Sequence, residues 1–233
     1  MLNLVCVLKP WRCFTGGEVI QFRPGVNLLV GNQGTGKSSL LEAIQIRGMK
    51  KPKSLHLPAA DSVPVIIDFQ GDAVPVFAFD FERDNYRTKS FFEDDITFHI
   101  GAMRSSHGEM VLAMLQGLEI VDKKLLVLFD EPDMALSIKS CRRLVRCFNH
   151  VADLGGQVIA TAHNPIVIAS YEHVYSVEHG KWIGGKEYID LQMAEKLPPL
   201  GTPTKPPPKK KRAKPRGSRR PPRSRKKSGR PAS

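Results

Sequence analysis

Residues 31–38 read Gly31-Asn32-Gln33-Gly34-Thr35-Gly36-Lys37-Ser38, which fits the pattern G-x-x-x-x-G-K-[ST]. In such a loop, the glycines let backbone N–H groups turn inward and donate hydrogen bonds to phosphate oxygens. Lys37 supplies a positive charge for the β- and γ-phosphates, and the Ser38 hydroxyl can ligate Mg²⁺. These eight residues therefore predict a loop that binds a nucleoside triphosphate with a magnesium ion. An ordinary glycine-rich turn is the alternative.

The segments on both sides of this loop favour the phosphate-binding interpretation. Residues 26–30 form an almost entirely apolar run, which is typical of a buried strand. Residues 39–47 read as a helix, so the loop would lie at the positive end of a helix dipole. Strand, glycine loop and helix in this order are the context that the motif requires.

The basic charge of the chain is confined to its C-terminal end. The 233 residues carry a formal net charge of +12, but residues 198–233 contain 14 Lys and Arg and no Asp or Glu, which leaves −2 for residues 1–197. Residues 198–233 also hold 10 of the 18 prolines, so they cannot bury enough surface to offset the entropy of ordering. We expect one domain over 1–197 and a disordered tail over 198–233. The tail either contacts nucleic-acid phosphates without sequence preference or is a solvated extension without a partner.

Composition limits the class of protein further. No run of 18 or more apolar residues is present, and residues 1–9 lack the features of a secretory signal. We therefore expect a cytoplasmic protein without a membrane span. The four cysteines form no C-x-x-C pair, and we expect them to be reduced packing residues rather than metal ligands.

Strand-like and helix-like segments alternate along residues 1–161, which predicts an α/β fold with a sheet covered on both faces. Short apolar runs predict strands at residues 2–9, 19–22, 26–30, 63–69, 74–81, 125–129 and 157–161. Helical periodicity predicts helices at residues 39–47, 108–121 and 138–153.

A second motif lies at residues 125–132, where the apolar run Leu-Leu-Val-Leu-Phe ends in Asp130, Glu131 and Pro132. Open α/β sheets bind ligands at the carboxyl ends of their strands. Asp130 is therefore placed to hold Mg²⁺, and Glu131 can polarise an attacking water. Two acidic residues that open a turn are the alternative.

At this point the sequence resembles a known family, the compact non-transporter ABC/AAA-type P-loop ATPases of the RecF, OLD and SMC kind. Residues 130–137 (DEPDMALS) resemble their Walker B and D-loop, and residues 158–163 (VIATAH) resemble their switch-histidine segment. Residues 105–109 (SSHGE) resemble their signature motif, and residues 12–14 (RCF) resemble the Arg and Phe near the start of many members. The resemblance implies an ABC-type head with a mixed central sheet flanked by helices.

The resemblance also implies a head-to-tail dimer that encloses two ATP molecules. Ser106 and Gly108 of one copy would cap the γ-phosphate held by the other, His163 would sense that phosphate, and Asp133 would lie across the dimer seam. Glu131 and His163 would be catalytic, and Ser38 and Asp130 would hold Mg²⁺. The implied nucleotide-binding residues are Gly31, Asn32, Gln33, Gly34, Thr35, Gly36, Lys37, Ser38, Ser39, Ser106 and Gly108.

The signature departs from the family, because His107 replaces the first glycine and Glu109 replaces the common Gln. The glutamine that usually follows the next strand is ambiguous, since Gln70, Asp80 and Glu82 all follow or end strand-like runs. Arg12 is either a nucleotide contact or a surface arginine.

Three functions follow from the sequence. The first is an Mg²⁺-dependent ATPase whose dimerisation gates a partner protein or a DNA-related process, such as repair or anti-phage defence. The second is the ATP-binding subunit of a membrane transporter. The sequence disfavours this function, because only 67 residues separate Lys37 from Ser105 and they contain no helix-rich segment with exposed apolar residues that could contact membrane helices. The third is a nucleotide-gated binding module with little hydrolysis.

Overall fold

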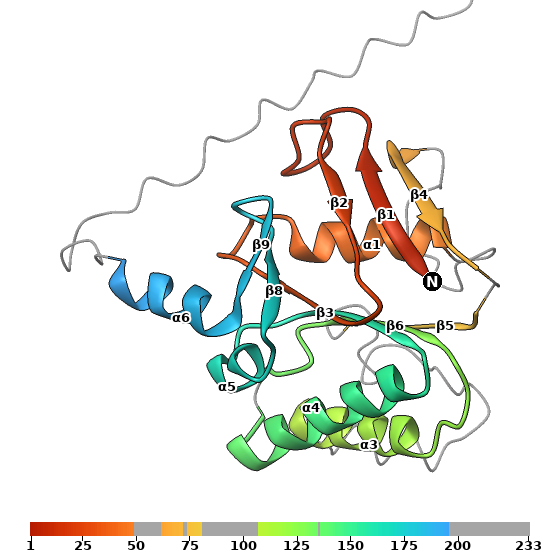
Figure 1. The fold of residues 1–233 in the computed structure, drawn as a ribbon, viewed down its shortest axis with the longest axis vertical. Helices are drawn as coiled ribbons and strands as arrows, with labels where there is room; N and C mark the ends of the chain where they lie inside the picture. Colours follow the sequence, from red (N-terminus) through yellow and green to blue (C-terminus); the bar gives the residue numbers. More distant parts are fainter. Residues whose placement is uncertain (49–61, 72–73, 81–106, 135, 196–233) are drawn as a thin grey trace, which may run out of the picture. The chain divides into compact units, whose positions relative to one another are not determined.

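The computed structural model describes residues 1–48, 62–71, 74–80, 107–134 and 136–195 (Figure 1). The strands are β1 (Leu2–Val7), β2 (Val19–Gln21), β3 (Gly25–Val30), β4 (Val65–Phe69), β5 (Val76–Asp80), β6 (Leu126–Asp130), β7 (Gln157–Thr161), β8 (His173–Ser176) and β9 (Lys181–Gly184). The helices are α1 (Lys37–Gly48), α3 (His107–Glu119), α4 (Ile138–Asp153), α5 (Pro165–Ala169) and α6 (Gly185–Ala194). The tail lies outside the described residues, so the predicted boundary after residue 197 stays a prediction.

The central sheet has six strands in the order β5-β6-β7-β3-β8-β9. Strands β5, β6, β7, β3 and β8 are parallel, whereas β9 pairs antiparallel with β8. Parallel neighbours end at the same edge, so the carboxyl ends of β3, β6 and β7 lie together. The predicted mixed α/β sheet is confirmed.

Both faces of this sheet are buried, which explains why its inner strands read as continuous apolar runs. In β6, Val127 and Phe129 pack on the same side as α3 and α4, whereas Leu126 and Leu128 pack on the side of α1. Successive strand residues point to opposite faces, so a strand buried on both faces needs apolar residues at every position. Figure 1 shows the two layers, with α3 and α4 on one side and α1 on the other.

A second, three-stranded sheet with the order β2-β1-β4 lies on the α1 side of the molecule (Figure 1). Strand β1 pairs antiparallel with both of its neighbours. The sequence predicted these strands but did not separate them from the central sheet, because local periodicity does not say which distant strand is the partner. Strand β1 also ends at Val7 rather than at residue 9.

Helix α4 begins after Ser137, whose hydroxyl accepts a hydrogen bond from the N–H of Ser140. Such a cap satisfies one of the N–H groups that have no partner in the first turn. The buried residues of α4 form one stripe along the helix: Cys141, Leu144, Cys147, Phe148 and Val151. Ile138, in the first turn, has the spacing of this stripe but is 67% exposed.

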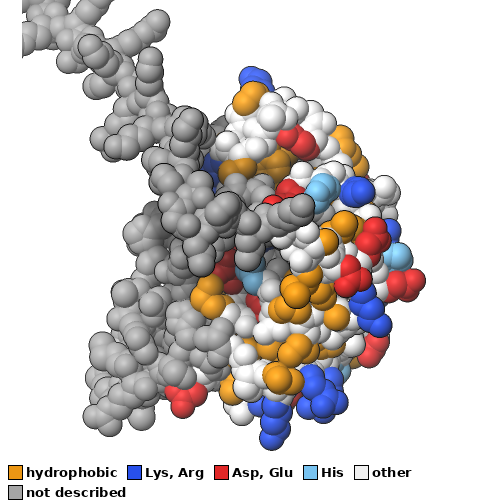
Figure 2. All heavy atoms as spheres, turned by 90° about the vertical axis from the view of Figure 1, so that its left-hand side faces the viewer, with side chains coloured by type: hydrophobic (Ala, Val, Ile, Leu, Met, Phe, Trp, Pro, Cys, Tyr) orange, Lys and Arg blue, Asp and Glu red, His pale blue; other side chains and the backbone are white. Residues whose placement is uncertain are grey.

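The segment after β7 continues as α5, β8, β9 and α6, none of which the sequence analysis predicted. These elements are short, and α5 has only five residues. Figure 2 shows acidic and basic side chains mixed on the described face of the molecule, together with several hydrophobic ones. That mixture agrees with the near-neutral charge of residues 1–197.

Candidate phosphate-binding and hydrolytic site

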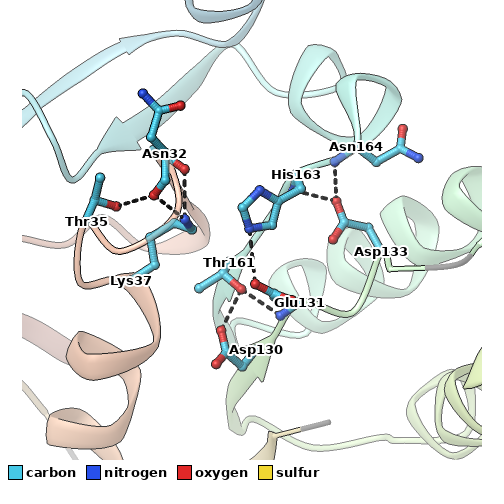
Figure 3. A network of polar contacts seen from close by, with 10 residues as sticks. Asn32, Thr35, Lys37, Asp130, Glu131, Asp133, Thr161, His163 and Asn164 are labelled. Atoms are coloured by element: carbon cyan, nitrogen blue, oxygen red, sulfur yellow. Dashed lines mark hydrogen bonds and ion pairs between the residues drawn. The ribbon is translucent and has the colours of Figure 1, made fainter. Parts of the chain in front are cut away.

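The predicted phosphate-binding loop connects β3 to α1, and α1 begins at Lys37. The Lys37 side chain is 5% exposed and folds back over the loop. Its Nζ donates hydrogen bonds to the carbonyl oxygens of Gly31 (2.8 Å) and Asn32 (3.0 Å). The Thr35 hydroxyl donates to the Asn32 carbonyl at 2.9 Å. The loop is therefore closed on itself around the lysine amine, as Figure 3 shows.

Two glycines of the loop are sites of close approach. A Cβ on Gly31 would lie 2.9 Å from the Thr35 Oγ1, and Gly31 has a φ of 148°. A Cβ on Gly36 would lie 3.1 Å from the Phe14 ring, and Gly36 has a φ of 106°. A residue with a side chain would be strained at either position. The glycines of the sequence pattern are therefore required by the shape of the loop backbone.

Burial lowers the pKa of the Lys37 amine below its usual value of 10.5. The carboxylates of Glu131 and, to a smaller extent, Asp130 oppose this effect by stabilising the charged amine. This electrostatic coupling indicates that the loop and the end of β6 share one site. A phosphate group placed there would favour the charged lysine further.

Asp130 and Glu131 lie where β6 ends. Glu131 has a φ of 49°, in the left-handed region that residues other than glycine rarely adopt. Its N–H donates to the Thr161 Oγ1 at 2.6 Å, and the same hydroxyl donates to the Asp130 Oδ1 at 2.8 Å. The end of β6 is thus tied to the end of β7 by one buried hydroxyl.

His163 follows β7 and faces Glu131. Its Nε2 lies 3.2 Å from the Glu131 Oε1, and both side chains are partly exposed to solvent. Figure 3 shows the imidazole pointing toward the Glu131 carboxylate. The Lys37 amine lies on the neighbouring loop in the same view. An exposed carboxylate held by a histidine is a group that can orient and polarise a water molecule.

Asp133 is 4% exposed and belongs to the interior of its own chain. Its Oδ2 accepts hydrogen bonds from the N–H groups of His163 (2.8 Å) and Asn164 (2.6 Å). Its Oδ1 is buried without a hydrogen-bond partner among the described residues. Within its own chain the carboxylate thus binds the backbone that carries His163, and the position of Asp133 across a dimer seam stays a prediction.

The residues present fit a magnesium nucleotide. Ser38 and Asp130 line the same small cavity, and hydroxyl and carboxylate oxygens are ligands that Mg²⁺ prefers. Among the described residues, no cluster of three or more His, Cys, Asp and Glu could hold a metal. Magnesium in phosphate-transfer sites often has only one or two protein ligands besides phosphates and water.

A larger cavity of about 490 Å³ lies on the other side of the loop. Its lining includes Cys13, Phe14, Gly34, Thr35 and Tyr175. Since Gly34 and Thr35 belong to the phosphate-binding loop, a group attached to bound phosphates could occupy this space.

Arg12 pairs with Glu42 of α1, and the sequence analysis did not foresee this contact. The two guanidinium nitrogens lie 2.5 and 2.8 Å from the two Glu42 carboxylate oxygens, and Nη1 also donates to the Ser39 hydroxyl at 3.2 Å. Glu42 is 3% exposed, so this charge is buried and neutralised by the arginine. The pair joins the segment around Arg12 to the first turns of α1.

Three further predicted positions are not tested by the geometry of this site. Ser106 and Gly108 are predicted to act on the nucleotide of a second copy; Ser106 lies outside the described residues, and Gly108 lies in the first turn of α3. Gln70 follows β4, and its backbone pairs with Met1 at the start of the chain. Glu82 and the side chain of Asp80 are not described, so the alternatives to Gln70 stay predictions.

Comparison with known protein families agrees with this geometry. A family model described as an AAA domain matches residues 6–130, which is more than half of the chain. The chain belongs to the AAA-domain family. Within that family it is a P-loop ATPase of the ABC/AAA kind to which the SMC, Rad50 and RecF proteins belong. A second AAA-domain model, whose description names the AbiEii toxin and type IV TA systems, matches residues 106–169 of this AAA-domain chain.

Individual relatives cover different parts of the AAA-domain chain. The DNA double-strand break repair Rad50 ATPase of Pyrococcus abyssi is 35% identical over an alignment of 77 residues, and the alignment covers 28% of this chain and 9% of the relative. The chain thus spans a small part of that protein. A nucleotide-free ATP-binding cassette from an ABC transporter superposes with a TM-score of 0.55, at 14% identity over 84% of this chain and 96% of the other. An ATP-binding cassette of an ABC transporter in its ADP conformation superposes with a TM-score of 0.52, at 14% identity over 84% of this chain and 100% of the other. These structures confirm the fold.

Proposed function

We propose that this chain binds ATP with Mg²⁺ and hydrolyses it. The observation that carries the proposal is the convergence of three elements at one edge of the central sheet (Figure 3). Lys37 comes from the start of α1, Asp130 and Glu131 come from the end of β6, and His163 follows β7. One site then contains a positive charge that can bind phosphates, oxygen atoms that can ligate a cation and a carboxylate that can activate a water molecule.

Each residue has a role that its position supports. The backbone of residues 31–39 would surround the phosphates, and Lys37 would exchange its carbonyl partners for phosphate oxygens. Ser38 and Asp130 would hold Mg²⁺, which bridges the phosphates and neutralises developing charge. The nucleoside would occupy the cavity beside Gly34 and Thr35.

Glu131 would act as the general base on the attacking water. His163 supports this role, because its Nε2 lies 3.2 Å from the Glu131 Oε1 and can hold that carboxylate in place. In phosphoryl transfer the protein need not form a covalent bond to the substrate. Most of the rate enhancement comes from positioning the reacting groups and from stabilising the charge of the transition state.

Phosphate release from ATP by the purified full chain tests the proposal. We expect release that stops when Mg²⁺ is removed with a chelator, and none from Lys37→Met, which keeps the length of the side chain but loses the charge. The matched control is Lys186→Met on the exposed surface of α6. Equal release by the Lys37→Met and wild-type proteins would show that the activity comes from a contaminant or from another site.

We further propose that ATP joins two copies head to tail. Exposed apolar side chains close to the end of β6 support this, since Met134 is 47% and Ile138 is 67% exposed. Gly108 lies at the N-terminus of α3, whose dipole would face the γ-phosphate of the other copy together with Ser106. Light scattering of Glu131→Gln with ATP should give twice the mass of the nucleotide-free chain, and a single-copy mass under both conditions would contradict the proposal.

The Rad50 relative is described as acting in DNA double-strand break repair, and this motivates a DNA-related role for the chain. The tail, with 14 Lys and Arg, would supply sequence-independent phosphate contacts. Binding to duplex DNA should weaken steeply as salt rises, and it should be lost from a chain that ends at residue 197. Undiminished binding by that truncated chain would contradict this role.

No described helix has the length and apolar character needed to cross a membrane. The likeness to transporter cassettes is one of fold, at 14% identity, so a transporter role is not proposed. A nucleotide-gated module with little hydrolysis would bind ATP and dimerise but release no phosphate. The cytoplasmic location stays a prediction.

A further inference from the structure

Thr161 is the last residue of β7 and the only polar residue of that strand besides Gln157 at its start. Its side chain is completely buried, at 0% exposure. A hydroxyl group has one hydrogen to donate and lone pairs that accept. The N–H of Glu131 can only donate, so the hydroxyl accepts from it at 2.6 Å and directs its own hydrogen to the Asp130 Oδ1 at 2.8 Å. The orientation of the hydroxyl is therefore determined.

The backbone of Glu131 explains why this hydrogen bond matters. A φ of 49° is unfavourable for a residue with a side chain, so neighbouring contacts must hold the peptide in this conformation. The bond from the Glu131 N–H to Thr161 does so directly. The turn that results brings the Glu131 carboxylate to 3.2 Å from the His163 Nε2.

The hydroxyl is not needed to pair the two strands. Residues 126–129 of β6 already pair in register with residues 157–160 of β7 through the backbone. Thr161 lies one residue beyond the last of these pairs. Its hydroxyl contacts two groups, and these belong to the proposed metal ligand Asp130 and the proposed base Glu131.

We propose that Thr161 is a positioning residue for hydrolysis. It acts through Asp130 and Glu131 by fixing the plane of the Asp130 carboxylate and the peptide of Glu131 at the same time. This inference rests on the proposed ATPase function and adds a residue to it. Hydrogen-bonding partners of metal ligands typically tune metal affinity and activity by 10- to 100-fold, roughly, when they are removed.

Thr161→Val is the direct test, because valine has the shape of threonine but no hydroxyl. We expect the Mn²⁺ affinity of the ADP-bound protein, measured by electron paramagnetic resonance, to fall about 10-fold. We expect kcat to fall by roughly 10- to 100-fold, while the KM for ATP and nucleotide binding in chelator change little. Thr161→Ser keeps the hydroxyl and should restore both quantities to near the wild-type values.

Ser176→Ala is the matched control, since Ser176 is another completely buried hydroxyl, on β8 and bonded to His179. It should leave Mn²⁺ affinity and kcat unchanged. Circular dichroism checks that each variant is folded. If Thr161→Val does not fold, Thr161→Cys keeps the volume with only a weak donor and should show the same losses.

Wild-type Mn²⁺ affinity and kcat in a folded Thr161→Val or Thr161→Cys would overturn the inference. Equal losses in Thr161→Ser would also overturn it, because the shape of the side chain rather than its hydroxyl would then matter. A wild-type chain without Mg²⁺-dependent phosphate release would instead contradict the proposed function. The two failures are thus distinguishable.

Discussion

Near the amino ends of β3 and β7 the sheet buries amide side chains, whereas the carboxyl ends of β6 and β7 carry charged ones. The Arg23 N–H donates to the Asn27 Oδ1, and the Asn27 Nδ2 donates to the Arg23 carbonyl, each at 2.8 Å. The Gln157 amide bonds the N–H and carbonyl of Leu2 at 2.8 and 2.9 Å, and so links the two sheets. Both side chains are completely buried and fully engaged with backbone groups of their own chain.

The carboxyl ends are organised differently. Glu131 has a strained backbone, Asp133 has a buried oxygen without a partner among the described residues, and Lys37 is buried against carbonyl groups. Strain and incompletely satisfied polar groups tend to persist at functional sites, where the surrounding structure compensates for their cost. The comparison supports the proposal that one edge stabilises the fold and that the other binds and acts on a ligand.

The largest effect should come from Glu131→Gln. Loss of a general base should reduce phosphate release by roughly 100- to 10,000-fold, while the free energy of unfolding stays near that of the wild type. Phosphate release and urea unfolding, measured on the same samples, check both halves of this expectation. Glu172→Gln, at an exposed position before β8, is the control and should change neither quantity.

Gln157→Ala should show the opposite pattern at the other edge. The substitution removes the partners of the Leu2 N–H and carbonyl and of the Arg23 carbonyl. Because each unsatisfied buried group costs about 1–3 kcal/mol, we expect a loss of about 3 kcal/mol in the free energy of unfolding. Phosphate release per folded molecule should be unchanged, and Gln21→Ala, at an exposed position of β2, should be neutral. A strong loss of turnover with unchanged stability would break the comparison.

Asp133→Ala should affect turnover and stability together, because the carboxylate ties the two strand exits. Without it, the N–H groups of His163 and Asn164 lose their acceptor. We expect kcat to fall about 10-fold as His163 loses its fixed position, since small displacements in a catalytic site are costly. Asp133→Asn keeps one acceptor oxygen and should retain most of the turnover. If Asn and Ala behave alike, the acceptor is not what matters.

Cysteine labelling should show the smallest effect. Cys13 is exposed and lines the cavity beside the loop, so a thiol reagent at pH 8 should modify it readily and Mg-ATP should slow the reaction severalfold. Burial, with a further contribution from Glu119, raises the pKa of the Cys147 thiol to about 11. Cys147 should therefore stay protonated and unreactive until the chain unfolds. Mass spectrometry of the labelled peptides distinguishes the two sites.

Much of this edge could be predicted from the sequence, because its signals are local. The glycine loop, the apolar run before Asp130 and the strand before His163 each have a residue pattern that reports its own conformation. The division into two sheets could not be predicted, since it depends on which distant strands pair. After β7, the strands of four residues and the helix of five residues give too short a pattern to predict, and the ten-residue α6 buries only Gly185 and Tyr188, so it lacks an apolar stripe.

The polar contacts within the site were the least predictable part. Thr161 reads as a residue of an ordinary buried strand, and a single signal, a hydroxyl at the end of an apolar run, distinguishes it. Glu42 reads as a solvated helix residue, yet it is buried against Arg12. Likewise, no signal in the sequence predicts that the Asp133 carboxylate binds the backbone of His163 in its own chain. Such pairings arise from the tertiary fold, which periodicity does not report.

Thermal unfolding with and without Mg-ATP tests the central claim, that ATP binds at the carboxyl edge while the amino edge stabilises the fold. At 100-fold excess over Kd, ATP should raise the Tm of the wild type by roughly 5–10 °C. Gln157→Ala should unfold at a lower temperature but show the same rise, and Lys37→Met should show none. An equal rise in Lys37→Met, or no rise in the wild type, would contradict the account.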